Sequence, residues 1–118
     1  DGRPVCNRTN TCLVESADTL FATGSHRLRP GAEGRLAQFF RTNGSTAFVV
    51  YGHTDPRGGF EYNMRLSENR ARTVANVAIR NGGSVSAARG FGPMHPVASN
   101  NSTAGMAQNR RVEILCVR

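Results

Sequence analysis

An aspartate and an arginine in the middle of the chain could together bind a ligand that carries both charges. Asp55 follows the continuous apolar run 47–52, and Arg70 lies further along, in a segment with helical spacing of apolar residues. A carboxylate and a guanidinium a few ångströms apart suit a zwitterion. The carboxylate accepts an ammonium group, and the guanidinium donates two parallel hydrogen bonds to a carboxylate. The chemistry on offer is non-covalent recognition.

Arg70 falls on the apolar side of its expected helix. At about 100° per residue, the segment 63–80 gathers its apolar side chains in one arc, which we expect to face a sheet. Asn63 and Arg70 lie inside that arc. An arginine on a packing face is costly unless its charge is matched and its donors are satisfied. The apolar members of the arc are Leu66, Ala71, Val74, Val77 and Ala78.

Asp55 is the expected partner of Arg70. It stands at the carboxyl end of a strand that a short loop joins to the helix, and ligands bind at this edge of α/β sheets. We expect both side chains at the mouth of the sheet, each charge partly free. Backbone amides at the helix start, placed at 63–66, would add donors for a ligand carboxylate. The alternative is a plain salt bridge that closes the loop.

His53 raises a second alternative, an enzyme or a metal site. With Asp55 it could act as a base and its orienting carboxylate, or the two could ligate a metal together with His26 or His95. However, no serine or cysteine stands in a recognisable nucleophile setting, and three histidines in unrelated segments are weak evidence for a site. We therefore expect no enzyme, no metal and no cofactor, and a locally hydrogen-bonded His53.

The elements that position these residues follow from hydrophobic spacing and turn signals. Residues 1–11 indicate a flexible lead-in and residues 12–118 a single domain. The expected order is β-α-β-α-β-β, an α/β (α+β) two-layer sandwich in which a mixed four-stranded sheet carries helices on one face. The expected strands are 12–21, 47–52, 84–92 and 111–117, the helices 30–42 and 63–80, and the long polar loop 93–108.

The charge of the chain suggests another class of partner. All fifteen basic residues are arginine, and the net charge is +7. Such a balance suits nucleic acid or an anionic surface, so a polyanion-binding module is the alternative function. However, the arginines are scattered along the chain, and there is no tryptophan for base stacking. We expect no nucleic acid partner. No stretch approaches the roughly 18 apolar residues of a membrane helix.

The cysteines indicate an oxidising compartment. There are three, Cys6, Cys12 and Cys116, which are too few for a structural zinc site. One disulfide with one thiol left over is the expected arrangement. Cys116 could bridge to Cys12 or to Cys6 and tie the ends of the chain together. The sequence leaves both pairings open.

A longer set of residues is similar to a known family. The central motifs resemble the signature of the OmpA-like peptidoglycan-binding domain, found in outer membrane protein A and the peptidoglycan-associated lipoprotein. The resemblance spans nearly the whole chain after residue 12, and its combined spacing is specific. It rests on Gly52-His53-Thr54-Asp55, Asn63, Leu66-Ser67, Arg70-Ala71 and Val74, then on Phe21, Ser25, Leu28, Pro30, Gly34, Gly92, Pro96, Gly105 and the run 109–114.

The resemblance implies non-covalent binding of the peptidoglycan stem peptide through diaminopimelate. It assigns the diaminopimelate ammonium to Asp55 and its carboxylate to Arg70. Asn63, Thr54 and Leu66 match further family contacts, the last two through backbone groups. It also implies a periplasmic location, attached to the outer membrane by parts of the full-length protein outside this chain. Other envelope proteins are further candidate partners.

One departure from the family pattern concerns the turn after the first strand. Family members often carry an aspartate there, whereas this chain has Ala22-Thr23-Gly24-Ser25. We therefore expect Thr23 and Gly24 to supply backbone donors instead. Asn109, Arg110 and Arg111 are assigned a supporting role, in which the paired arginines brace the sheet or pair with Glu113.

Overall fold

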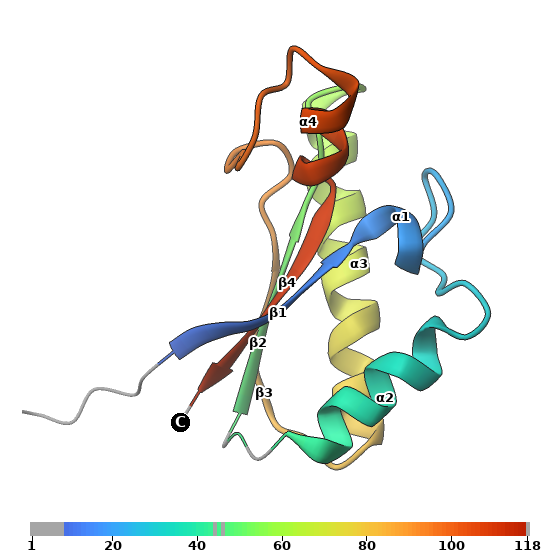
Figure 1. The fold of residues 1–118 in the computed structure, drawn as a ribbon, viewed down its shortest axis with the longest axis vertical. Helices are drawn as coiled ribbons and strands as arrows, with labels where there is room; N and C mark the ends of the chain where they lie inside the picture. Colours follow the sequence, from blue (N-terminus) through green and yellow to red (C-terminus); the bar gives the residue numbers. More distant parts are fainter. Residues whose placement is uncertain (1–8, 44, 46, 118) are drawn as a thin grey trace, which may run out of the picture.

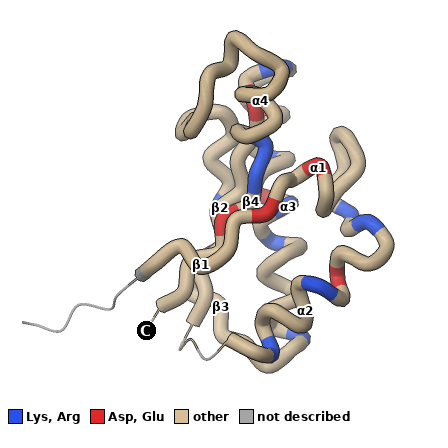
Figure 2. Tube along the Cα trace, viewed as in Figure 1, with Lys and Arg blue, Asp and Glu red and all other residues tan. Residues whose placement is uncertain are grey.

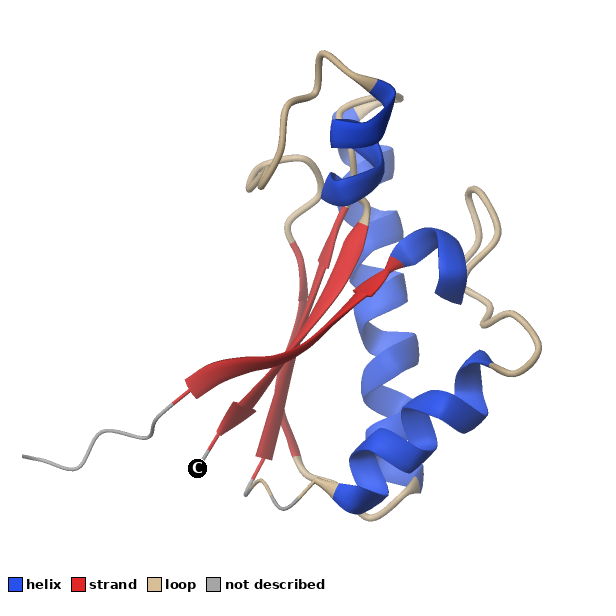
Figure 3. Ribbon diagram, viewed as in Figure 1, coloured by secondary structure: helices blue, strands red, loops and turns tan. Residues whose placement is uncertain are grey.

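A mixed four-stranded sheet forms one layer of the molecule, and helices cover one of its faces (Figures 1 and 3). The computed structural model describes residues 9–43, 45 and 47–117. Its strands lie in the order β1-β4-β2-β3. The elements follow one another as β1 (Thr9–Ser16), α1 (Ala17–Leu20), α2 (Ala32–Thr42), β2 (Ala47–His53), α3 (Phe60–Arg80), β3 (Val85–Gly90), α4 (Thr103–Asn109) and β4 (Arg111–Val117).

The sheet confirms the predicted mixed topology. β4 pairs antiparallel with both β1 and β2, while β2 pairs parallel with β3. Alternate residues of the strands face the helices, because successive side chains of a strand point to opposite faces. Phe48 and Val50 of β2 and Ile114 of β4 are buried in a core with Val74 of α3 and Phe40 of α2. This core lies between the two layers.

Two glycines bring α3 close to the sheet. A Cβ at Gly52 of β2 would overlap the backbone oxygen of Ser67, and a Cβ at Gly90 of β3 would overlap the backbone nitrogen of Glu68. Only residues without a side chain allow the helix backbone to approach this closely. Because α3 is held against β2 in this way, its first turns lie beside the loop that follows that strand (Figure 1).

The N-terminal part of the chain differs from the expectation in two ways. β1 begins at Thr9, so residues 9–11 belong to a strand rather than to a lead-in, because they pair with β4. Residues 1–8 lie outside the described residues. The segment 17–21, expected to continue the strand, instead begins with α1. The Ser16 hydroxyl accepts a hydrogen bond from the Asp18 N–H (3.2 Å) and caps this short helix.

The expectation also placed the start of one helix wrongly and missed another helix. α3 begins at Phe60 rather than at Asn63, with Gly59 as its N-cap residue. α4 occupies part of the segment 93–108, which was expected to be a loop. It is too short to show helical periodicity, and the Ser102 hydroxyl, which accepts from the Gly105 N–H (3.0 Å), caps its start. Strand β3 is also shorter than the predicted range 84–92.

No helix in the described ranges is long and apolar enough to cross a membrane.

A disulfide joins Cys12 of β1 to Cys116 of β4, with 5.8 Å between their Cα atoms. One of the two predicted pairings is therefore confirmed. The alternative partner, Cys6, lies outside the described residues. The bond links neighbouring strands that are 104 residues apart in sequence. It therefore ties the edge strand to the part of the sheet that carries the core.

Removing this disulfide is expected to destabilise the fold. The double variant Cys12→Ser/Cys116→Ser should lose about 2–4 kcal/mol of unfolding free energy, because the cross-link restricts the unfolded chain. Urea unfolding followed by circular dichroism measures the loss. Cys6→Ser is the control and should unfold like the wild type. Equal unfolding of the double variant and the wild type would contradict a stabilising role for the bond.

Candidate functional site

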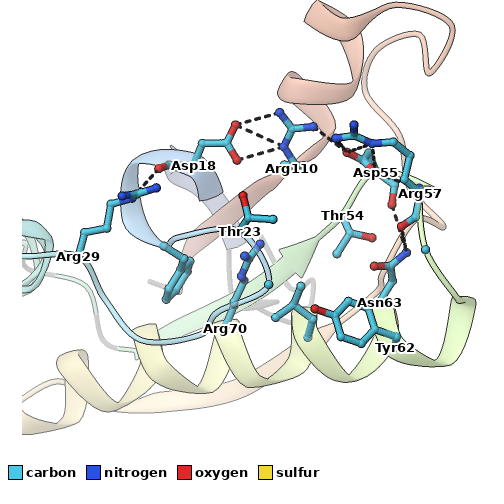
Figure 4. Close-up of a pocket in the computed structure, with 14 residues that line it drawn as sticks. Asp18, Thr23, Arg29, Thr54, Asp55, Arg57, Tyr62, Asn63, Arg70 and Arg110 are labelled. Carbon is cyan, nitrogen blue, oxygen red and sulfur yellow. Dashed lines mark hydrogen bonds and ion pairs between the residues drawn. The ribbon is translucent and has the colours of Figure 1, made fainter.

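A pocket of about 440 Å³ opens between α1 and the turn after it, the loop after β2, the N-terminal half of α3, and Arg110, which stands between α4 and β4 (Figure 4). Among its lining residues are eight that the sequence singled out: Thr23, Gly24, Thr54, Asp55, Asn63, Leu66, Arg70 and Arg110. Six others were not assigned to the site from the sequence: Asp18, Phe21, Arg29, Arg57, Gly58 and Tyr62.

Arg70 is buried in the pocket wall, and its hydrogen bonds go to neutral groups. Its Nε donates to the carbonyl oxygen of Ser25 (2.8 Å) and its Nη2 to that of Ala22 (3.1 Å). The guanidinium carbon lies 5.1 Å from the centre of the Phe21 ring. Burial lowers the pKa of Arg70 from its usual range, but an arginine stays charged at neutral pH. A positive charge thus lines the pocket with no carboxylate hydrogen-bonded to it in the described chain.

The turn from Ala22 to Ser25 is therefore held by Arg70. Two backbone carbonyls of this turn fix the guanidinium in return. Gly24 adopts a left-handed conformation (φ 70°) in this turn, which glycine adopts without strain. The backbone N–H groups of Thr23 and Gly24 donate to no acceptor among the described residues, and their role as ligand donors stays a prediction.

Asp55 is paired more fully than expected, and its partners were not those expected. Its carboxylate accepts from the Arg57 backbone N–H (2.9 Å), from Arg57 Nη2 (2.9 Å) and from Arg110 Nη1 (2.6 Å). Burial alone would raise the pKa of Asp55, but the hydrogen bonds from Arg57 and Arg110 outweigh it and lower the pKa from 3.8 to about 2. Within the described residues, Asp55 makes no ion pair with Arg70. The alternative of a plain Asp55–Arg70 salt bridge is therefore wrong, and so is the expectation that Asp55 is partly free, because Arg57 and Arg110 occupy its carboxylate.

Arg110 connects two carboxylates at the rim of the pocket. Its Nε and Nη2 donate to Asp18 of α1 (3.0 and 2.9 Å), while its Nη1 donates to Asp55. The hydrogen bonds from Arg110 lower the pKa of Asp18, and the same contacts raise the pKa of Arg110. The sequence predicted a supporting arginine here but missed Asp18, because it placed that residue in a strand.

Asn63 fixes the loop after β2. Its amide nitrogen donates to the carbonyl oxygen of Arg57 (2.8 Å) and, at longer range, to that of Asp55 (3.4 Å). The buried Asn63 side chain predicted from the helical wheel is thus confirmed. Its polar group holds the backbone that carries the aspartate.

The expected backbone donors on α3 are not available. Because the helix begins at Phe60, the Asn63 N–H donates to the Gly59 carbonyl (3.0 Å), and the Leu66 N–H lies inside the helix. The Thr54 N–H donates to the Gly92 carbonyl (2.9 Å). The expectation that helix amides at 63–66 bind a ligand is therefore wrong. Leu66 and Thr54 nevertheless line the pocket.

Asn109 and Arg111 support the structure away from the pocket. The Asn109 carboxamide oxygen accepts from the N–H groups of Val97 and Ala98 (2.7 and 3.0 Å) and holds the loop before α4. Arg111 pairs with Glu113 (2.7 Å) and donates to the His95 carbonyl oxygen (2.9 Å). Both residues therefore brace the loop and the sheet.

His53 is not part of the pocket lining. Its ring is buried against Phe91, and its Nε2 lies 3.3 Å from the Glu113 carboxylate. Burial lowers the pKa of His53, and Arg111 acts in the same direction, so the ring is neutral at pH 7. Across the described residues, no group of three or more histidine, cysteine, aspartate or glutamate side chains is placed to hold a metal ion.

The arginines between residues 9 and 117 do not form one basic face. Figure 2 shows them spread over α2, α3 and the start of β4. The pocket brings four together, Arg29, Arg57, Arg70 and Arg110, with the two aspartates Asp18 and Asp55. Its lining therefore carries excess positive charge, which suits a small acidic ligand.

Known proteins with similar sequences are bacterial envelope proteins. The probable lipoprotein YiaD of Escherichia coli is 43% identical over 110 residues, which cover 89% of this chain and 50% of that protein. The peptidoglycan-associated lipoprotein of Pseudomonas putida is 40% identical over 101 residues, which cover 80% of this chain and 59% of that protein. The chain thus spans about half the length of these relatives. Another relative is named outer-membrane lipoprotein YfiB, from Pseudomonas aeruginosa, which agrees with the predicted attachment to the outer membrane.

Solved structures share the fold. The cell wall anchor of the T6SS from Pseudomonas aeruginosa matches with a TM-score of 0.76 and 33% identity, covering 88% of this chain and 78% of that one. The model of the OmpA family matches residues 20–110. This range includes both charged residues of the pocket that the sequence first indicated. The chain belongs to the OmpA family.

Proposed function

We propose that this domain binds peptidoglycan without cleaving it, and that it recognises the diaminopimelate of the stem peptide. Membership of the OmpA family supports peptidoglycan binding in general, since relatives carry the names peptidoglycan-associated lipoprotein and cell wall anchor. The observation that carries the finer proposal is the pocket itself. The guanidinium of Arg70 and the carboxylate of Asp55 both line this pocket.

Arg70 is assigned the carboxylate of the ligand. Its two hydrogen bonds to carbonyl oxygens fix the plane of the guanidinium but leave its charge without a counter-ion. A ligand carboxylate would supply the counter-ion in a site shielded from water, where charge pairing is stronger. Thr23 and Gly24 also line the pocket, and their N–H groups would add neutral donors.

Asp55 is assigned the ammonium group. Its pKa of about 2 keeps it ionised at neutral pH. Within a stem peptide, diaminopimelate uses one amino and one carboxyl group in the chain and presents a free ammonium beside a free carboxylate at its other end. A lysine in the same place presents an ammonium alone. Only the first could satisfy both Asp55 and Arg70.

A binding domain of this kind would link a longer envelope protein to the wall. We propose that the remaining part of the protein carries the attachment to the outer membrane. This domain would then hold the wall from the periplasmic side. The excess positive charge of the pocket lining favours the acidic stem peptide.

Loss of either charge should weaken binding strongly. Asp55→Ala and Arg70→Ala are each expected to weaken binding to a diaminopimelate-containing stem peptide at least about 30-fold, because removing one partner of a desolvated charge pair costs about 2–5 kcal/mol. Isothermal titration calorimetry measures the change. Arg72→Ala is the control, since Arg72 is exposed on α3 outside the pocket. Wild-type affinity in either pocket variant, with the fold intact by circular dichroism, would refute the assignment.

The dependence of binding on pH follows from Asp55. Because its pKa in the folded protein is about 2, affinity should stay constant from about pH 8 to about pH 4. The ion pairs of Asp55 stabilise the fold fully above its unfolded pKa of 3.8, and their contribution is lost as the pH falls toward about 2. Calorimetric titrations of the ligand between about pH 8 and about pH 4 measure the affinity. A midpoint near pH 6–7 would point to a histidine instead.

The absence of catalysis can be tested with intact walls. Purified peptidoglycan sacculi incubated with the domain should release no soluble muropeptides, because the pocket offers charged groups for binding and no assembled nucleophile. Chromatography of the supernatant measures release, with a muramidase as the positive control. Release above the level of a buffer blank would favour a hydrolase.

A further inference from the structure

Asp55, which we propose binds the ligand ammonium, is already paired with the guanidinium of Arg57. Asp55 accepts hydrogen bonds from the Arg57 side chain at both oxygens, from Nε (3.3 and 3.2 Å) and from Nη2 (2.9 Å). Figure 4 shows this guanidinium beside Asp55 at the edge of the pocket. A ligand ammonium therefore cannot approach the whole carboxylate while Arg57 stays in place.

The two arginines that contact Asp55 are held very differently. Arg110 also binds Asp18 through two of its nitrogens, and its side chain is 21% exposed. The Arg57 side chain is 65% exposed, and its only ion pair among the described residues is with Asp55. A long, exposed side chain in a single ion pair gives up that contact at little cost. Arg57 is thus the partner that a ligand can displace.

The backbone beneath Arg57 is fixed independently of its side chain. The Arg57 carbonyl accepts from Asn63, and its N–H donates to Asp55. The guanidinium can therefore leave the carboxylate by side-chain rotation, without unfolding the loop. The hydrogen bond from the Arg57 N–H to Asp55 would remain and would keep the carboxylate oriented.

We infer that Arg57 is a specificity-determining residue that caps Asp55 in the free protein and competes with the ligand ammonium for it. The inference rests on the proposed function and adds a requirement to it. A ligand must bring its own cation to displace Arg57. A molecule that offers carboxylates alone leaves the cap in place and gains nothing at Asp55.

Removing the cap should tighten the binding of amines selectively. Arg57→Gln is expected to raise the affinity for free meso-diaminopimelate about fivefold, a modest effect because the ion pair that is removed is exposed to solvent. Pimelate, the same carbon chain without amino groups, should bind no more tightly to the variant than to the wild type. Calorimetric titration of both ligands against both proteins measures the difference.

Arg72→Gln provides the matched control. The Arg72 side chain is equally exposed at 65% and forms a single ion pair with Glu68 (3.3 Å), so it loses the same charge outside the pocket. It should leave both affinities unchanged. A gain of equal size in this control would show a general charge effect and overturn the capping role.

The remaining outcomes separate the two proposals. If the wild type binds diaminopimelate and Arg57→Gln binds it equally or more weakly, Arg57 is not a competitor and the inference fails alone. Tighter binding of pimelate by Arg57→Gln would also overturn it. If no form binds diaminopimelate, the proposed function fails and the inference fails with it. Binding by Arg57→Gln alone would support both.

Discussion

The pocket depends on a buried arginine whose hydrogen bonds are satisfied while its charge is not. Arg70 donates to the carbonyl oxygens of Ala22 and Ser25, so its orientation is fixed by neutral groups. Had a carboxylate of the protein taken these positions, the pair would be complete and a ligand would gain little. The structure instead holds a desolvated cation at the pocket wall, and this charge would favour the acidic ligand that we propose.

The fold supplies what this arrangement requires. Gly52 and Gly90 allow the backbone of α3 to lie directly on β2 and β3, which places Arg70 beside the turn that it holds. The same helix carries Asn63, whose amide fixes the loop after β2 and therefore Asp55. α3 thus positions both charges. It carries Arg70 itself, and its Asn63 side chain holds the backbone next to Asp55 by donating to the Arg57 carbonyl. The disulfide between β1 and β4 ties down the strand that leads into α1 and Asp18.

The sequence predicted the elements with strong periodicity and the residues that break it. Hydrophobic spacing predicted the two central strands and the long helix. The buried position of Arg70 could be predicted because an arginine inside an apolar arc breaks the pattern. The partner of Arg70 could not be found, because its acceptors are backbone carbonyls, which any residue type would provide. Asp18 and α4 were missed for a related reason. Asp18 lies in α1, and both α1 and α4 are short helices, each capped by one serine, that are too short to give a periodic signal.

Asp55 shows why residue type alone does not give the state of a site. The sequence suggested a half-free carboxylate, whereas the structure surrounds it with Arg57 and Arg110. These contacts differ in how firmly each arginine is held, because Arg110 has Asp18 as a second anchor and Arg57 has none in the described chain. A carboxylate held by one firm and one loose cation remains ionised and correctly oriented, and yet can exchange the loose partner. Under the proposed function, recognition of a zwitterion would require both of its charges, one to complete Arg70 and the other to replace Arg57.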